Sequence, residues 1–290
     1  MRAAGVVYEE HRPDPALTGW IASYWSLAVF RGSRPWLTVP PEGCAHLAFR
    51  GGRGVLLGPR VEPLRSPAVA GSPWFGVRFR PGAARAFLGL SSALPLRNAL
   101  QPVETVEGLE WAGELAGELA GVDGEVRVSI TDRRLLSLAA SAKEPDAALA
   151  NAIGLILASA RPPGVGCLAT AAGLSARQFR RRFTAAVGLS PKELLRVWRF
   201  RRCALDAFDR RSEWGARGGP GWAAHAFRHG YSDQSHLIRE FRRLVGLGPA
   251  ELARRISAIE LTASAWASPP PSGDALQRRA RRSPATGRPV

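Results

Sequence analysis

Two stretches of the chain carry basic and polar side chains at a spacing that places them on one face of a helix. In the first stretch these are Arg177, Arg180 and Arg181, and in the second they are Ser235, Arg239 and Arg242, with Gln234 at the helix start. The opposite face of each helix is apolar, because aromatic and aliphatic residues recur there every four positions. Arginine can form two hydrogen bonds to guanine, and glutamine can do so with adenine. Both helices therefore have the groups needed to read bases in the major groove of duplex DNA.

The two helices belong to an internal repeat. Residues 179–194 and 237–252 share eight of sixteen residues at an offset of 58. Upstream, the correspondence continues at an offset of 57, so one residue must be inserted in the turn of one copy. The sequence therefore contains two copies of one structural unit.

Each unit is predicted to fold as a helix, a tight turn and a second helix. In the first unit the short helix covers residues 168–172, Gly173 provides the turn, and Ser175 is the expected N-cap with a glutamine three residues later. In the second unit the short helix covers residues 222–229, and Ser232 is the expected N-cap. This order is the helix-turn-helix pattern, in which the second helix enters the major groove.

The distribution of charge supports a polyanionic partner. Residues 145–260 contain 19 basic and 9 acidic side chains, a net charge of +10, whereas residues 1–144 contain 16 and 14, a net charge of +2. A helix predicted over residues 191–208 joins the two units and spans about 27 Å at about 1.5 Å per residue. That length is close to the roughly 34 Å between successive major-groove faces, so one monomer could read two adjacent grooves.

By these features residues 145–256 resemble the AraC/XylS family of bacterial transcription regulators. The resemblance rests on the motifs that begin at Gly173, Gly188 and Gly230. It implies a domain of seven helices that binds promoter DNA without a cofactor. The link over residues 210–221 is longer and richer in glycine than the family pattern. The candidate DNA-binding residues are Arg177, Gln178, Arg180, Arg181, Gln234, Ser235, Arg239 and Arg242.

The chain as a whole is predicted to be an α+β protein of two domains. Short apolar segments bounded by glycine and proline indicate an N-terminal domain that is a small β-barrel or β-sandwich. The C-terminal domain is predicted to be all-α, and Thr131 and Asp132 are expected to cap an earlier helix. The expected divisions are a regulatory or sensor module over 1–108, a helical connector over 109–144, the DNA-binding domain over 145–258 and a disordered basic tail over 264–290.

The N-terminal domain has candidate ligand-binding residues. Trp25, Trp36 and Trp74 are available to line an apolar pocket, with His46 and Arg78 as polar groups. Such a pocket would take a small-molecule effector that regulates the DNA-binding half. The alternative is that these aromatic side chains fill the interior of a small β-domain. Both interpretations remain open from the sequence.

Enzymatic and metal chemistry are not predicted. Residues 162–169 match a dinucleotide-binding glycine pattern only loosely, because two prolines stand where a strand is required. His225 and His229 lie four apart on a helix, but Ala226 occupies the position that a zinc protease gives to glutamate. We therefore expect no catalytic residues, no metal and no cofactor. The alternative function is a small-molecule-binding or enzymatic N-terminal domain fused to a nonspecific nucleic-acid-binding helical domain.

The expected location is the bacterial cytoplasm, in association with the nucleoid. No apolar run reaches the roughly 18 residues of a membrane span, no secretory signal is visible at the start, and the three cysteines suit a reducing compartment. Double-stranded promoter DNA is the expected partner. RNA polymerase, a small-molecule effector and a second copy of the chain are further candidate partners.

Overall fold

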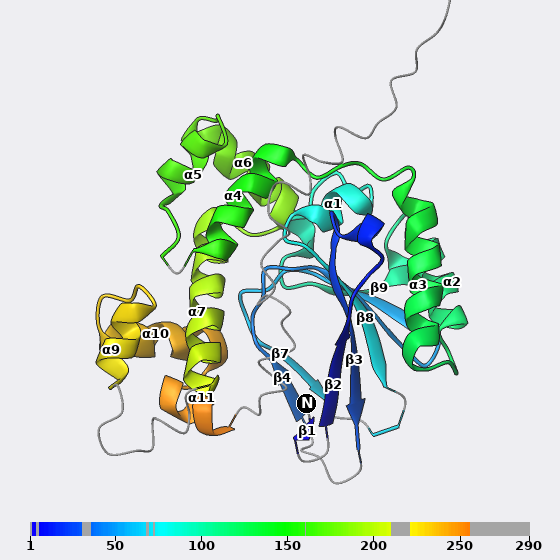
Figure 1. Ribbon diagram of the computed structural model, residues 1–290, viewed down its shortest axis with the longest axis horizontal. Helices are drawn as coiled ribbons and strands as arrows, with labels where there is room; N and C mark the ends of the chain where they lie inside the picture. Colours follow the sequence, from blue (N-terminus) through cyan, green and yellow to red (C-terminus); the bar gives the residue numbers. More distant parts are fainter. Residues whose placement is uncertain are drawn as a thin grey trace, which may run out of the picture.

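The computed structural model describes residues 2–3, 6–30, 36–67, 70–71, 73–159, 161–209 and 221–255. Figure 1 shows a β-sheet domain built from the first half of the chain beside a helical domain built from the second half. The basic tail expected over 264–290 lies outside the described residues, as does most of the glycine-rich link over 210–221.

An antiparallel sheet of seven strands forms the centre of the N-terminal domain. In spatial order the strands are β1 (Arg2–Ala3), β2 (Val6–His11), β3 (Ile21–Val29), β8 (Trp74–Phe79), β5 (His46–Arg50), β6 (Arg53–Leu57) and β9 (Leu100–Pro102). A second sheet pairs β4 (Trp36–Val39) with β7 (Leu64–Pro67). The predicted β-rich domain is confirmed. Its sheet is open where a small barrel would close, because β1 and β9 lie at opposite edges.

Both faces of the inner strand β5 are buried. Leu47 and Phe49 point into an apolar core, and His46 lies on the opposite face beside Glu42. The core around Leu47 also contains side chains of the short helix α1 (Ala83–Phe87) and of the 3₁₀ helices η1 (Pro15–Leu17), η2 (Leu94–Leu96) and η3 (Val103–Thr105). The strand is therefore held between this core and a polar layer that faces the helical domain.

Helices α2 (Glu110–Glu118) and α3 (Gly124–Ala139) lie beside the sheet (Figure 1) and pack Leu115 and Leu135 into the same core. The carboxylate of Asp132 accepts hydrogen bonds from the hydroxyl of Tyr24 at 2.7 Å and from the backbone N–H of Asp14 at 2.9 Å. The predicted helix start at Thr131 and Asp132 is wrong, because both residues lie inside α3 and Asp132 binds the N-terminal segment. The boundaries expected for the connector stay a prediction.

The described part of 147–255 contains seven helices. They are α4 (Ala147–Ala158), α5 (Val165–Ala171), α6 (Ala176–Val187), α7 (Pro191–Asp209), α9 (Trp222–Arg228), α10 (Gln234–Val245) and α11 (Pro249–Arg255). One apolar core gathers α4, α5, α6 and the first part of α7 around Trp198, and another gathers the later part of α7, α9, α10 and α11 around Phe200. The predicted all-α C-terminal domain is confirmed, and α7 is the element that its two cores share.

Candidate DNA interface

The first helix-turn-helix consists of α5, a turn and α6. Gly173 adopts a φ of +64°, and the N–H of Leu174 donates to the carbonyl of Ala169 at 3.0 Å, which closes the end of α5. The hydroxyl of Ser175 accepts from the N–H of Gln178, and the side chain of Gln178 accepts from the N–H of Ser175 at 3.1 Å. The predicted capping box is confirmed, and it occupies the amide oxygen of Gln178, a candidate DNA-binding residue.

Helix α6 has one apolar face and one basic face. Phe179 and Phe183 are fully buried, with their rings 5.4 Å apart. Arg177, Arg180 and Arg181 are exposed. A helix that buries one stripe must present the other to solvent, so these three guanidinium groups are accessible to a partner.

The second helix-turn-helix consists of α9, a longer turn and α10. Gly230 adopts a φ of +74°, as its counterpart does in the first unit. The predicted N-cap Ser232 is wrong by one residue, because Asp233 caps α10 by accepting from the N–H of His236 at 2.7 Å. Helix α9 ends 57 residues after α5 ends, whereas α10 begins 58 residues after α6 begins. The inserted residue lies in the turn between α9 and α10, and it shifts the N-cap of α10 by one position.

Helix α10 repeats the two-faced arrangement of α6. Leu237 and Phe241 are buried, and the ring of Phe241 lies 4.8 Å from that of Phe200 on α7. The exposed side chains on the outer face include Gln234, Ser235, Arg239 and Arg242. The structure therefore exposes all four residues that were predicted to bind DNA in this unit.

The arginines predicted to read bases differ from their neighbours in their contacts with carboxylates. Within the described ranges, none of those on α6 or α10 forms an ion pair. Their neighbours do, since Arg182 pairs with Asp146, and Arg196 pairs with Glu240 at 3.0 Å. The structure thus separates arginines that hold helices together from arginines that remain available to a polyanion.

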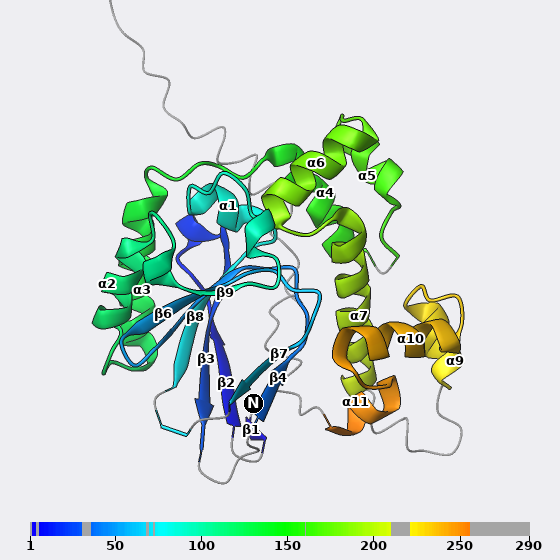
Figure 2. The same ribbon diagram turned by 180° about the vertical axis from the view of Figure 1, so that it is seen from behind.

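Helix α7 sets the distance between the two units. Figures 1 and 2 show α5 and α6 at one end of α7 and α9 and α10 at the other end. Its 19 residues span about 28 Å at about 1.5 Å per residue. Arg161 connects the units directly, since it donates to the carbonyl of Phe227 at 3.0 Å and lies 4.7 Å from the centre of that ring.

The first unit is also bound to the N-terminal domain. The N–H of Ala93 donates to the carbonyl of Ala185 in α6 at 2.7 Å. Gly188, at the end of α6, has a φ of +79°, and a Cβ there would lie 2.6 Å from the carbonyl oxygen of Ala93. Arg97 and Glu193, at the start of α7, form an ion pair of 2.6 Å. The C-terminal end of α6 is therefore fixed against the sheet domain.

A buried cluster of charges continues this contact along α7. Arg201 is 3% exposed and donates to the carbonyl of Pro41 at 3.2 Å and to the carboxylate of Glu42 at 3.3 Å. One oxygen of Glu42 also contacts Nε2 of His46, and its other oxygen lies 3.9 Å from Nε of Arg78. The cluster therefore joins a helix of the C-terminal domain to two strands of the N-terminal domain.

Protonation within this cluster is set by its mixture of charges. Burial alone would raise the pKa of the Glu42 carboxyl. Contact with His46 and the positive charges of Arg78 and Arg201 outweigh burial and hold the pKa of Glu42 well below its usual value. Burial lowers the pKa of Arg201, and Glu42 opposes that shift. Glu42 is therefore ionised throughout the neutral range.

The structure brings together three of the five predicted ligand-binding residues. The indole of Trp25 donates to Nδ1 of His46 at 3.1 Å, and the backbone of Arg78 pairs with that of His46 across adjacent strands. Arg78 is buried and ion-paired with carboxylates of the protein. Trp74 lies on the same strand as Arg78, whereas Trp36 lies in the separate two-stranded sheet. Ligand binding by these residues stays a prediction.

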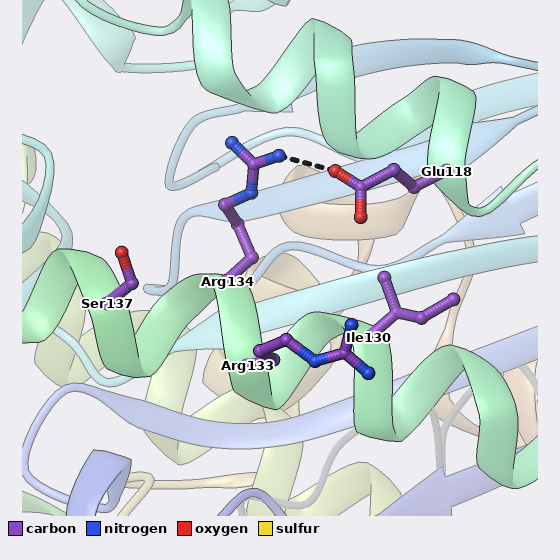
Figure 3. Close-up of a pocket in the computed structure, with 5 residues that line it drawn as sticks. All are labelled: Glu118, Ile130, Arg133, Arg134 and Ser137. Atoms are coloured by element: carbon purple, nitrogen blue, oxygen red, sulfur yellow. Dashed lines mark hydrogen bonds and ion pairs between the residues drawn. The ribbon is translucent and has the colours of Figure 1, made fainter.

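Two surface cavities in the described part of the chain lie elsewhere. One of about 260 Å³ lies between α2 and α3 (Figure 3) and is lined by Glu118, Ile130, Arg133, Arg134 and Ser137. Arg134 forms an ion pair with Glu118 across it and another with Glu114 at 2.8 Å. A second cavity of about 210 Å³ is lined by residues of β2, β3, α3 and the start of β8. Neither includes a predicted ligand-binding residue.

Sequence reasoning missed the pairing of Arg201 with Glu42. One signal was present, because Leu194, Val197 and Ala204 form a buried stripe on α7 and Arg201 falls within it. An arginine inside an apolar stripe requires an acceptor, since burying an unpaired charge is very unfavourable. Nothing in the helical sequence indicates that this acceptor is supplied by a loop some 160 residues earlier.

Two family models match separate parts of the chain. Residues 168–255 match a helix-turn-helix domain, and residues 9–99 match a domain of unknown function (DUF6597). No curated protein matches the sequence. Among the described residues, no helix has both the length and the apolar character that a membrane crossing requires.

Similar solved structures include three of ToxT from Vibrio cholerae. A structure at 1.65 Å is 9% identical, with a TM-score of 0.39, and the match covers 88% of this chain and all of that one. The structure from strain O395 is 11% identical, with a TM-score of 0.37 and the same coverage. An apo variant from strain SCE256 is 10% identical, with a TM-score of 0.38, over 87% of this chain and 97% of that one.

Proposed function

We infer that this chain, whose residues 168–255 are an AraC-type helix-turn-helix domain, is a transcription regulator that binds duplex DNA at specific base sequences. The observation that carries the proposal is the repetition of one surface. Helices α6 and α10 each bury an aromatic face and expose a basic face whose predicted base-reading arginines form no ion pair within 4 Å among the described residues. One rigid helix, α7, holds both.

The proposed binding mode places α6 and α10 in neighbouring turns of the major groove. The length of α7, about 28 Å, compares with a repeat of roughly 34 Å for successive major-groove faces. Arg181 and Arg239 are the proposed contacts to guanine, and Gln234 is the proposed contact to adenine. The remaining exposed arginines are proposed to bind phosphates, which fixes register without reading sequence.

Selection from a random duplex pool tests sequence specificity. The full chain should enrich one motif with two conserved blocks about one helical turn apart, since each unit reads one groove. Binding should weaken by orders of magnitude between about 50 and 200 mM salt, because phosphate contacts release counterions. Enrichment of no motif would favour the alternative of nonspecific binding by the helical domain.

We also propose that the N-terminal domain regulates DNA binding through its contact with α6 and α7. The supporting observations are the bond from Ala93 to Ala185 and the ion pair of Arg97 with Glu193. Arg97→Glu places like charges together and should change affinity for the selected motif severalfold, whereas Arg53→Glu, at the exposed first residue of β6, should not. Equal affinities for both variants would argue against regulation through this contact.

The proposed role as a transcription regulator also implies further partners and a location in the cell. A regulator of this kind acts on promoter DNA in the cytoplasm and requires no catalysed reaction. RNA polymerase, a small-molecule effector and a second copy of the chain are its proposed further partners. Sedimentation of the chain with and without the selected duplex would give the number of copies bound to each site.

A further inference from the structure

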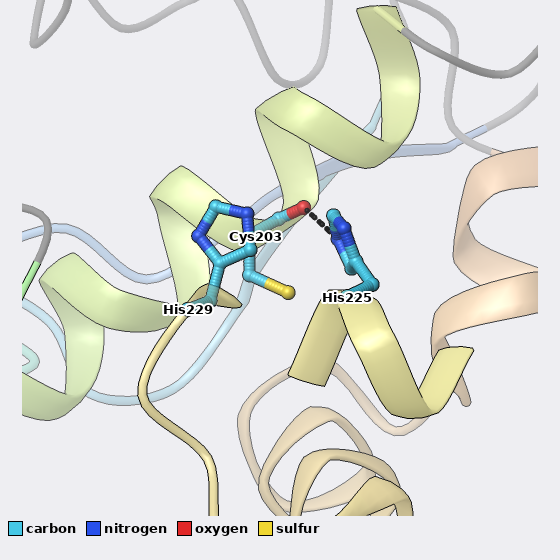
Figure 4. Close-up of side chains that lie close together, drawn as sticks. All are labelled: Cys203, His225 and His229. Carbon is cyan, nitrogen blue, oxygen red and sulfur yellow. Dashed lines mark hydrogen bonds between the residues drawn. The ribbon is translucent and has the colours of Figure 1, made fainter. Parts of the chain in front are cut away.

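Three side chains with metal-binding atoms meet between α7 and α9. Cys203 comes from α7, His225 comes from α9, and His229 is the residue that follows α9 (Figure 4). The sulfur and one ring nitrogen of each histidine all lie within 4.8 Å of one another, and all three residues are buried. The sequence indicated only the two histidines, because Cys203 is 22 positions away and is brought close by the packing of the two helices.

A carboxylate lies at the edge of this cluster. One oxygen of Asp206, one turn along α7 from Cys203, lies 3.0 Å from Nε2 of His229 and 3.4 Å from Nδ1 of His225. Nε2 of His225 lies 3.0 Å from the backbone carbonyl of Cys203, which can only accept a hydrogen bond. In neutral His225 the proton therefore resides on Nε2, and Nδ1 presents its lone pair towards Asp206.

We propose that Cys203, His225 and His229 bind one divalent transition-metal ion, with zinc as the ion that the donors fit best. Thiolate and imidazole ligands select zinc over magnesium or calcium, which prefer oxygen. In tetrahedral zinc sites with bonds of about 2.0–2.3 Å, ligand atoms lie about 3.3–3.8 Å apart. The observed separations, at most 4.8 Å, therefore have to close by no more than about 1.5 Å, which side-chain rotations can achieve.

The surroundings of the site suit a metal in two further ways. The hydrogen bond from His225 to the carbonyl of Cys203 is the contact that commonly orients a metal-binding imidazole, and Asp206 plays the same part for His229. The side chain of Asp206 is 24% exposed and that of His229 is 10% exposed, so the cluster has an opening to solvent on this side. An ion has a path into the site there.

The protonation states of the ligands agree with this assignment. Burial lowers the pKa of His225 to about 4 and also lowers that of His229, so both rings are neutral at pH 7, the form that binds metal. Burial and the charge of Asp206 raise the pKa of the Cys203 thiol. A bound cation would reverse that shift and release the thiol proton to solvent, as metal binding does at other cysteine sites.

The metal would connect the second helix-turn-helix to α7. Helix α9 is the first helix of the second unit, and the chain between α7 and α9 lies outside the described residues. Bonds from one ion to both helices would stabilise the orientation of α9 on α7 without relying on that link. The proposal does not depend on DNA binding, and its test is read without DNA.

Titration with Co²⁺ tests the site in the full chain after reduction and chelator treatment. We expect one equivalent to bind, with the visible absorption of tetrahedral cobalt and a thiolate-to-metal charge-transfer band, both abolished by added Zn²⁺. Zn²⁺ should raise the melting temperature of the same protein. Absence of a stoichiometric tetrahedral cobalt spectrum in the wild-type chain would overturn the proposal, whatever the variants do.

Matched variants assign the ligands. C203S should lose the charge-transfer band, whereas C167S, at an exposed cysteine on α5, should keep it. H229Q should weaken Co²⁺ binding at least tenfold, and D206N should weaken it by about 10–100-fold while the band remains. H11Q, at a histidine of the sheet domain, should change nothing. Circular dichroism of the metal-free variants establishes folding, and persistence of the band in a folded C203S protein would contradict the assignment.

Discussion

Arg201 on α7 and Glu42 in the loop before β5 form a hydrogen-bonded ion pair of 3.3 Å between the two domains, with side chains only 4% and 8% exposed. The helix that spaces the two helix-turn-helix units is thereby bound to the sheet domain at its middle as well as at its start. A movement of the loop around Glu42 cannot leave α7 unaffected, because a buried charge needs its partner.

Removal of the negative charge at Glu42 should destabilise the protein. Glu42→Gln keeps the shape of the side chain but removes the carboxylate charge that faces the buried Arg201, while Arg78 keeps its ion pair with Glu10 at 2.8 Å. We expect the free energy of unfolding in urea to fall by about 3–5 kcal/mol, as for other broken buried pairs. The exposed Glu62 offers the control, since Glu62→Gln should change the free energy of unfolding by less than about 0.5 kcal/mol. Equal stability of the two variants would mean that the cluster contributes little.

The same carboxylate should make stability depend on pH in the acid range. The pKa of Glu42 is lower in the folded protein than the value of about 4.3 in an unfolded chain, so the unfolded state binds the proton more readily. The contribution of the ionised Glu42 to the free energy of unfolding is fully present above about pH 5 and is lost as the pH falls below about 4. Urea unfolding at pH 7, 4 and 3 should show this loss in the wild type and a shallower loss in Glu42→Gln. Parallel pH profiles would exclude Glu42 as the source.

Arg181→Ala and Arg239→Ala should each weaken binding to the selected DNA motif by about 1–3 kcal/mol if each arginine contacts a base. Binding to random duplex should change much less. Fluorescence anisotropy with both duplexes at one fixed salt concentration measures the difference. Arg133→Ala, an exposed arginine of α3 in the sheet domain, is the control. An equal loss on both duplexes would identify a phosphate contact instead.

Gly188 and Gly246 form a matched pair that isolates the contact between α6 and the sheet domain. Gly188 follows α6 and Gly246 follows α10, each with a φ near +75°. A Cβ at Gly246 would meet no atom within 4 Å, whereas a Cβ at Gly188 would clash with the carbonyl of Ala93. Gly246→Ala should cost about 1–2 kcal/mol of stability from backbone strain alone. Gly188→Ala should cost about 1–3 kcal/mol more through overpacking. Urea unfolding of both variants measures the difference, and equal costs would show that Ala93 yields without penalty.

The repeated units were predictable because their determinants are local. Glycine at the turn, a capping box and aromatic residues four apart fix a helix-turn-helix with little help from the rest of the chain. The cap of the second unit was misplaced because Ser232 and Asp233 are adjacent and both can cap, so sequence does not decide between them. The approach of Cys203 to His229 and the pairing of Glu42 with Arg201 depend on how helices and domains pack, which no local pattern encodes.

The N-caps of α6 and α10 differ in charge, so the two helix-turn-helix units are not equivalent. Helix α6 begins with a neutral serine, whereas α10 begins with a carboxylate whose pKa is lowered by the N–H of His236, so it stays ionised at neutral pH. A negative charge at that position opposes a nearby phosphate, while the neutral cap leaves the helix dipole available to one. In the proposed binding mode the two halves of a bound duplex would therefore be distinguishable, and a single copy would have a defined direction along it.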